Sequence, residues 1–211
     1  MKTTQFNSLF IEAKHEVPSP HHKVMIVMHG LGDCKESYLP FIGEINVTGL
    51  AYVLIDAPRP YPIGSSWYDL PPANPMIGVK ESSDKVIKLI EELKASGYQN
   101  DDIFLCGFSQ GGCIALHTFF NYNHKLGGVV ALSPRVFYSE LNKSLSDQAK
   151  KTPLFMAHGE FDPVIPYTEV SEAQHLIREQ GLDVSFYAYE MEHEIDPIEM
   201  KDLREWLNEY L

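Results

Sequence analysis

The sequence is poor in cysteine, and the few it has argue against two common stabilising sites. Its 211 residues include 3 cysteines, Cys34, Cys106 and Cys113. An odd number without the paired spacing of metal ligands speaks against a disulfide framework and against a zinc site. We therefore expect neither a metal nor another cofactor, and a cytoplasmic location.

Basic residues and long apolar runs are also scarce. Lys and Arg together number 17 against 29 Asp and Glu, which gives a formal net charge of −12. A net charge of this sign repels phosphate backbones, so nucleic acid is not an expected partner. No apolar run approaches the roughly 18 residues of a membrane span. The first ten residues lack the apolar stretch of a secretory signal. We expect no integral membrane segment.

What the sequence does contain is a regular alternation of short apolar runs and segments with helical periodicity. The runs read as strands buried on both faces, as in a parallel sheet; they are Lys23–His29, Ala51–Ile55, Ile103–Phe108, Gly128–Leu132, Pro153–Ala157 and Val184–Tyr189. Helices are predicted over Val79–Ser96 and Pro197–Tyr210, the latter with Asp196 as N-cap and Glu199 completing a capping box. The pattern predicts an α/β fold with a mostly parallel central sheet flanked by helices, and residues 1–211 as a single domain.

One long proline-rich stretch, residues 57–78, interrupts this alternation. It contains six prolines, which restrict the backbone and favour a preformed wall over a flexible lid. A loop of this length in a compact domain usually has a function. Its apolar side chains suit an acyl chain near water; they are Tyr61, Ile63, Trp67, Tyr68 and Leu70. We therefore expect 57–78 to be a substrate loop.

A G-x-S-x-G motif follows the third predicted strand and precedes an apolar helical segment. It reads Gly107-Phe108-Ser109-Gln110-Gly111. In a nucleophile elbow the serine occupies a strained turn, and side chains two residues to either side would collide with the neighbouring strand and helix. Ser109 is the candidate nucleophile.

A serine hydroxyl needs a base, and in this fold the base follows the nucleophile and the acid in the chain. The candidates are His175 and His193. His175 falls inside a predicted helix, where a surface position is the simpler interpretation. His193 follows the last predicted strand, from which a side chain can reach the elbow. We favour His193 as the base.

The acid that orients this base should lie between the two. Asp162 and Glu160 both follow the strand Pro153–Ala157. Asp162 lies deeper in the loop and precedes Pro163, whose ring stiffens the backbone. We favour Asp162 over its rival Glu160.

Hydrolysis through a tetrahedral intermediate also needs backbone N–H donors for the oxyanion. One should belong to Gln110, the residue after the nucleophile. The other should come from a glycine-rich turn after an early strand, and His29-Gly30-Leu31-Gly32-Asp33 fits, with Leu31 as the donor.

Five motifs together resemble one known family, the small carboxylesterase, lysophospholipase and acyl-protein thioesterase group of α/β hydrolases. The motifs are HGLGD at 29–33, SWYDL at 66–70, GFSQGG at 107–112, HGEFDPVIP at 158–166 and HEI at 193–195. The resemblance implies Ser109, Asp162 and His193 as a catalytic triad, in agreement with their chain order. It also implies that Trp67 lines the acyl site.

The expected function is that of a serine hydrolase that cleaves carboxylic esters or thioesters through an acyl-enzyme. Expected substrates are small acyl esters or thioesters, including lysophospholipids or acylated proteins, and the expected state is a monomer or homodimer. The alternative is a non-catalytic ligand-binding protein on the same fold. The complete set of Ser109, Asp162 and His193 favours the enzyme.

Overall fold

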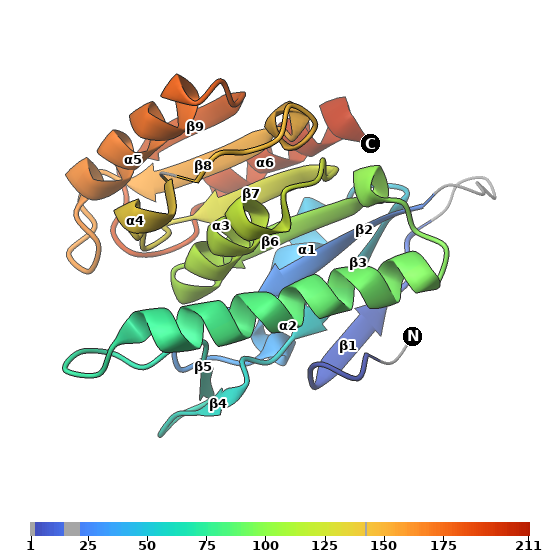
Figure 1. The fold of residues 1–211 in the computed structure, drawn as a ribbon, viewed down its shortest axis with the longest axis horizontal. Helices are drawn as coiled ribbons and strands as arrows, with labels where there is room; N and C mark the ends of the chain where they lie inside the picture. The colour runs from blue at the N-terminus through green and yellow to red at the C-terminus, as the bar shows by residue number, and fades with distance from the viewer. Residues whose placement is uncertain (1–2, 15–21, 142) are drawn as a thin grey trace.

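One seven-stranded sheet organises the residues that the computed structural model describes, which are 3–14, 22–141 and 143–211 (Figure 1). Its strand order is β1-β3-β2-β6-β7-β8-β9, with β1 antiparallel to β3 and every other neighbouring pair parallel. The strands are β1 (Ser8–Ile11), β2 (Lys23–Met28), β3 (Leu50–Ile55), β6 (Ile103–Phe108), β7 (Gly128–Leu132), β8 (Leu154–Gly159) and β9 (Val184–Tyr189). All six predicted strands are present, and the predicted α/β fold is confirmed; the edge strand β1 was not predicted.

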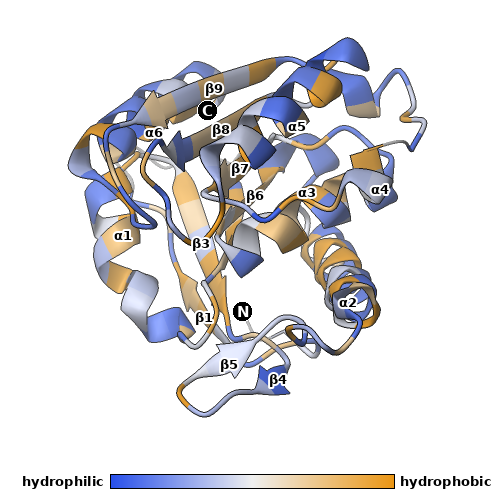
Figure 2. Ribbon diagram, turned by 90° about the vertical axis from the view of Figure 1, so that its left-hand side faces the viewer, coloured by the Kyte–Doolittle hydropathy of each residue, from blue (hydrophilic) through white to orange (hydrophobic). Residues whose placement is uncertain are grey.

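Helices cover both faces of the sheet (Figures 1 and 2). On one face lie α1 (Leu39–Ile45) and α6 (Pro197–Tyr210); on the other lie α2 (Pro75–Ala95), α3 (Gln110–Tyr122), α4 (Tyr138–Leu141) and α5 (Tyr167–Glu179). Alternate residues of β2 serve the two cores: Ile26 packs on the side of α2 and α3, and Val27 on the side of α1 and α6. Burial on both faces explains why the central strands are almost continuously apolar. Short 3-10 helices are η1 (Lys35–Tyr38), η2 (Asn100–Asp102) and η3 (Ala149–Lys151).

The proline-rich stretch is more structured than the sequence suggested. Residues Arg59–Pro60 (β4) and Ser65–Ser66 (β5) form a small antiparallel hairpin. The last four residues of the predicted loop, 75–78, belong instead to α2. Pro75 opens this helix because its fixed φ suits the first turn, and Asn74 caps it by accepting a hydrogen bond from the Met76 N–H at 3.0 Å.

The N-terminus of α6 has the predicted capping box. The Asp196 carboxylate accepts from the Ile198 N–H at 2.7 Å, and the Glu199 carboxyl accepts from the Asp196 N–H at 3.4 Å. Glu199 is completely buried, and burial raises its pKa to about 8. A buried carboxyl without a cation beside it favours its neutral form because the charged form loses its hydration.

Replacing Glu199 by Gln should stabilise the protein by an amount that grows with pH. The folded carboxyl keeps its proton up to a pH of about 8, whereas its ordinary pKa is 4.5, so the wild type loses stability as the pH rises through that window. Glutamine has the same shape and no charge. Each unit of pKa difference corresponds to about 1.4 kcal/mol, and we expect a gain of at least that size near pH 8 relative to pH 5.

Thermal unfolding of both proteins across that pH range measures the difference. Glu205→Gln, on the exposed side of the same helix, is the control and should follow the wild type. A difference between Glu199→Gln and wild type that is constant with pH would contradict the neutral carboxyl.

Candidate active site

Ser109 occupies a strained turn between β6 and α3. Its φ is 55° and its ψ is −115°, a backbone conformation that residues other than glycine rarely adopt. The turn is fixed on both sides, because the Ser109 N–H donates to the Leu132 carbonyl at 2.9 Å and its carbonyl accepts from the Cys113 N–H at 3.0 Å. The hydroxyl is thereby presented at the carboxyl end of the sheet.

Two glycines make room for this turn. A Cβ on Gly111 would lie 2.1 Å from the Met28 carbonyl oxygen of β2, and a Cβ on Gly107 would lie 2.2 Å from the backbone of Gly111. Both distances are far below van der Waals contact. The neighbouring strand and helix start therefore exclude any side chain at the two glycine positions of the motif.

The structure brings Ser109, His193 and Asp162 into one hydrogen-bonded relay. His193 Nδ1 lies 2.6 Å from Asp162 Oδ2, and His193 Nε2 lies 2.8 Å from Ser109 Oγ. A carboxylate only accepts, so Nδ1 carries the proton and Nε2 is the acceptor for the serine hydroxyl. The Phe108 ring packs on the imidazole with centroids 4.9 Å apart.

Asp162 is buried and held by donors on every side. Its Oδ1 accepts from the Val164 and Ile165 N–H groups, both at 2.8 Å. Nε2 of the fully buried His158 lies 2.8 Å from the Ile165 carbonyl and 3.3 Å from Asp162 Oδ2. Burial alone would raise the pKa of Asp162, but the hydrogen bonds from Ile165, His193 and Val164 outweigh it and keep that pKa below its ordinary value. The carboxyl is therefore ionised at neutral pH.

The two rival side chains lie elsewhere. His175 is exposed on α5, and Glu160 is exposed at the start of the loop that carries Asp162. Of the four side chains, His193 and Asp162 are the two that the structure joins to Ser109 by hydrogen bonds.

Leu31 and Gln110 line the same cavity as Ser109 and His193. Gln110 is the first residue of α3, where backbone N–H groups have no partner within the helix and the helix dipole favours an anion. The Leu31 N–H makes no hydrogen bond to any residue that the structure describes. Both amides are therefore available to an oxyanion.

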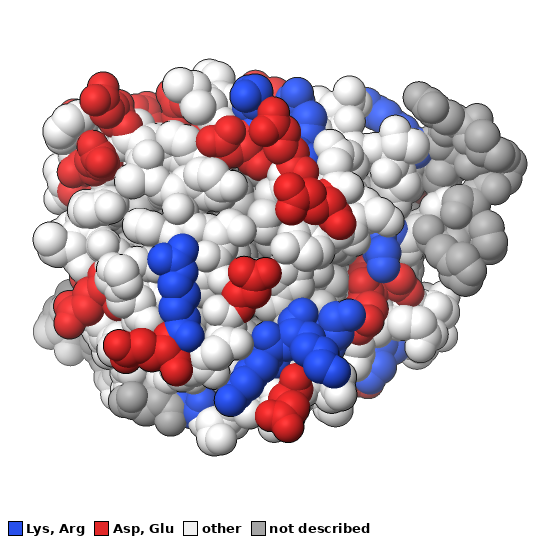
Figure 3. Space-filling view, turned by 90° about the horizontal axis from the view of Figure 1, so that it is seen from above, with Lys and Arg blue, Asp and Glu red and all other residues white. Residues whose placement is uncertain are grey.

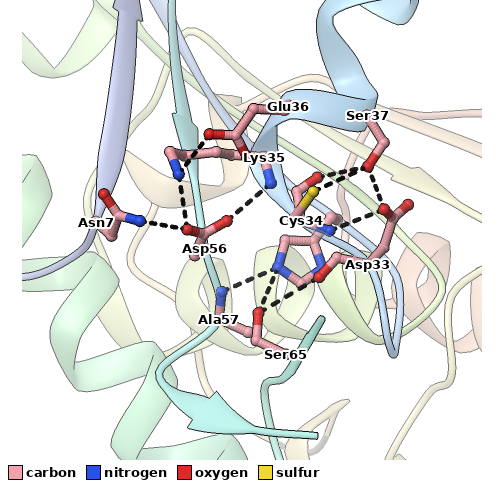
Figure 4. A network of polar contacts seen from close by, with 10 residues as sticks. Asn7, Asp33, Cys34, Lys35, Glu36, Ser37, Asp56, Ala57 and Ser65 are labelled. Atoms are coloured by element: carbon pink, nitrogen blue, oxygen red, sulfur yellow. Dashed lines mark hydrogen bonds and ion pairs between the residues drawn. The ribbon is translucent and has the colours of Figure 1, made fainter. Parts of the chain in front are cut away.

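A buried histidine anchors the turn that carries Leu31. His29 Nδ1 donates to the Gly30 carbonyl at 2.6 Å. Its Nε2 accepts from the Ala57 N–H at 3.0 Å and the Ser65 hydroxyl at 3.1 Å, and Figure 4 labels these two donor residues. Burial lowers the pKa of His29, which keeps Nε2 free of a proton and able to accept. The Gly32 N–H also donates to the Ser65 carbonyl at 2.9 Å. The turn is thus tied to the β4–β5 hairpin.

A second set of polar contacts fixes the end of the same turn. The Asp33 carboxylate accepts from the Cys34 N–H at 2.8 Å, and Lys35 donates to Asp56 through both its backbone N–H and its ammonium group, each at 2.8 Å (Figure 4). Asn7 donates to the same Asp56 carboxylate at 2.6 Å. Asp56 directly follows β3, so the turn after β2 is fastened to the neighbouring strand.

The cavity above the relay has a volume of 600 Å³ and a mainly apolar lining. The apolar lining residues are Leu31, Tyr38, Phe41, Tyr68, Leu70, Phe108, Val164, Ile165 and Ile195. Across the described residues, no cluster of three or more His, Cys, Asp or Glu side chains could hold a metal ion. The cavity can therefore hold an apolar group next to the Ser109 hydroxyl.

Trp67 lies away from this cavity, contrary to the sequence expectation. Its side chain is fully buried, with ring centroids 5.9 Å from Phe6 and 5.5 Å from His29. Its neighbours Tyr68 and Leu70 line the cavity, whereas Trp67 is absent from the described lining residues. Burial in the core removes more of the indole's apolar surface from water than a position on the cavity wall would, and so stabilises the fold more. The resemblance alone carried no information on which way this side chain points.

Comparison with known proteins identifies relatives that match most of the chain. A family model for phospholipases and carboxylesterases matches residues 8–211. Acyl-protein thioesterase 1 of Emericella nidulans is 31% identical over 89% of this chain and 90% of that protein. Carboxylesterase SOBER1 of Arabidopsis thaliana is 29% identical over 87% of this chain and 89% of its own.

Solved structures agree with these matches. The crystal structure of Arabidopsis thaliana SOBER1 superposes with a TM-score of 0.81 at 26% identity, covering 90% of this chain and 99% of that one. Esterase PE8 shares the fold, with a TM-score of 0.85 at 20% identity and coverage of 98% and 99%. The motifs, the sheet and the relatives lead to one assignment, which confirms the expected family: this chain belongs to the phospholipase/carboxylesterase family of α/β hydrolases.

Proposed function

We propose that this protein hydrolyses carboxylic esters or thioesters through an acyl-enzyme on Ser109. The observation that carries the proposal is the relay from Ser109 through His193 to Asp162, which opens onto an apolar cavity beside two available amides. The names of the relatives, thioesterase and carboxylesterase, support the same class of reaction.

In the acylation step, Ser109 Oγ attacks the carbonyl carbon while its proton passes to His193 Nε2. The 2.8 Å separation of these atoms suits direct transfer. The ionised Asp162 then stabilises the imidazolium through the 2.6 Å bond to Nδ1. The carbonyl oxygen becomes an anion, and the Leu31 and Gln110 N–H groups donate to it. One donor of this kind typically contributes a factor of about 10²–10³ in kcat.

Collapse of the tetrahedral intermediate releases the alcohol or thiol, which takes the proton from His193. A water molecule then repeats the sequence against the acyl-enzyme. His193 removes a proton from water while the water oxygen bonds to the acyl carbon. The ester bond to Ser109 then breaks, Ser109 Oγ takes that proton back from His193, and the carboxylic acid leaves. Every proton that His193 accepts is returned within the cycle, so these steps need no other proton carrier.

The apolar cavity supports acyl substrates, and we propose lysophospholipids or acylated proteins among them. The acidic net charge of −12 disfavours nucleic acid. On the face drawn in Figure 3, basic and acidic side chains are interspersed around uncharged surface. Within the described ranges, no helix is both long and apolar enough to cross a membrane. The monomeric or homodimeric state and the cytoplasmic location stay predictions.

Ser109→Ala should abolish turnover while the fold persists. Removing the hydroxyl leaves no atom to carry the acyl group, and loss of a triad serine typically lowers kcat by about 10⁶. Hydrolysis of p-nitrophenyl butyrate by wild type and variant measures the effect, with Ser83→Ala as the control. Ser83 lies on α2, outside the described cavity lining. More than a few per cent of activity in a clean preparation of Ser109→Ala would contradict the proposal.

Asp162→Asn should lower kcat by about 10⁴, as the loss of the orienting carboxylate does in serine proteases. The amide cannot stabilise the imidazolium and favours the wrong tautomer of His193. Glu160→Gln is the matched control, because it removes one carboxylate of the same loop from an exposed position. Steady-state kinetics of the pair should separate them by at least about 10³ in kcat. Equal effects of the two changes would rule out a specific role for Asp162.

A further inference from the structure

We infer that Trp67 is the positioning residue that holds the two halves of the oxyanion hole together. The inference rests on the proposed function, because it takes the Leu31 and Gln110 amides as the oxyanion donors. These amides belong to separate segments, the turn after β2 and the start of α3. Trp67 belongs to neither segment, and it hydrogen-bonds to both.

The first bond reaches the turn that carries Leu31. The indole Nε1–H of Trp67 donates to the His29 carbonyl at 2.8 Å. His29 precedes Leu31 by two residues, so this bond fixes the backbone immediately before the oxyanion donor. The indole has a single donor and no acceptor, and it can serve only one partner.

The second bond reaches the elbow. The backbone N–H of Trp67 donates to Gln110 Oε1 at 3.0 Å. The Ser66 hydroxyl donates to the Tyr68 carbonyl at 2.7 Å, and its oxygen lies 3.2 Å from the same Gln110 Oε1. Gln110 Nε2 donates in turn to the Tyr68 carbonyl at 3.2 Å. The carboxamide of Gln110 therefore accepts from and donates to the backbone of residues 66–68. Only a group with both functions can do this, which gives the glutamine side chain a purpose separate from its backbone amide.

The third bond fixes Trp67 itself. Its carbonyl accepts from the Ser82 hydroxyl of α2 at 2.7 Å, and Ser82 is fully buried. The side chain of Trp67 is also fully buried, so water does not compete for these bonds. All three polar groups of Trp67 are satisfied in one geometry. A shift of the ring would leave a buried donor or acceptor without a partner.

The consequence for catalysis is specific. Oxyanion donors act only when negative charge develops, so their misplacement lowers kcat and leaves ground-state binding almost unchanged. Donors must be held within about 0.5 Å of the productive geometry. If Trp67 positions the oxyanion hole, its loss should lower kcat and leave KM unchanged. The affinity for an oxyanion analogue should fall by the same factor as kcat.

The chain supplies a matched control, because it contains 2 tryptophans and both are buried. Trp206 packs against Phe155 on the opposite side of the sheet, and its indole N–H has no partner among the residues described. Trp67→Phe removes an indole N–H that holds the oxyanion turn. Trp206→Phe also removes an indole N–H, but this one makes no hydrogen bond to any described residue.

We would measure kcat and KM with p-nitrophenyl butyrate, and the inhibition constant of an alkyl trifluoromethyl ketone, which binds as a hemiketal oxyanion. For Trp67→Phe we expect kcat to fall and the inhibition constant to rise by at least about tenfold, with KM within about twofold; the loss of a whole donor would cost about 10²–10³. For Trp206→Phe we expect all three constants within about twofold of wild type. Thermal unfolding of both variants reports their stability separately.

Three results would overturn the inference. The first is an unchanged kcat and inhibition constant in Trp67→Phe. The second is a raised KM with kcat preserved, which would make Trp67 a substrate-binding residue. The third is an equal loss in Trp206→Phe, which would make the effect one of general core packing.

Gln110→Met provides a second route if Trp67→Phe does not fold. Methionine keeps the backbone amide and the side-chain length but cannot bond to residues 66–68. We expect the same fall in kcat and rise in the inhibition constant, and unchanged values would overturn the inference. Failure of the proposed function looks different, because wild type itself would then neither hydrolyse the ester nor bind the ketone.

Discussion

The site depends on one strained residue, Ser109, whose backbone is held at a φ of 55°. A conformation of this kind costs on the order of 1–3 kcal/mol and persists only where the surroundings enforce it. Here β2, β7 and the start of α3 enforce it, through the contact of Gly111 with the Met28 carbonyl and the bond from the Ser109 N–H to Leu132. The strain is the structural cost of exposing a hydroxyl at the carboxyl end of a sheet whose strands are otherwise buried.

Around this serine, two neutral histidines give rigidity while a third is available for chemistry. His29 directly follows β2, and His158 is the second-to-last residue of β8. Burial lowers the pKa of each. Neither carries a charge at neutral pH, so each has a defined donor and acceptor nitrogen. His29 holds the turn that bears Leu31, and His158 Nε2 donates to the Ile165 carbonyl in the loop that carries Asp162. His193 instead lines the cavity, where the proposed mechanism has it exchange protons with substrate and water.

The sequence was most informative where a short-range physical pattern decides the structure. Strands buried on both faces are continuously apolar, and Asp196 and Glu199 satisfy helix amides three residues apart, so both were predictable. The strand β1 was missed because its four residues are only partly buried and its pairing with β3 is long-range. Chain order predicted which of several acids and histidines would meet Ser109, although catalytic roles stay a proposal.

Trp67 shows what the sequence could not reveal. The same aromatic residue suits a cavity wall or a core, and tertiary packing decides between them. Its three hydrogen-bond partners, His29, Gln110 and Ser82, come from three distant segments of the chain. No local pattern contains such an arrangement. The side chain of Gln110 was overlooked for the same reason, because its partners lie more than forty residues earlier.

Covalent labelling tests most directly whether Ser109 is an activated nucleophile. The intact protein would be treated with an alkyl fluorophosphonate, digested, and mapped by mass spectrometry. We expect one phosphonyl group per chain on the peptide that contains Ser109, and none after pretreatment with a trifluoromethyl ketone. An unlabelled protein, or a label on any other residue, would contradict an activated serine at this site.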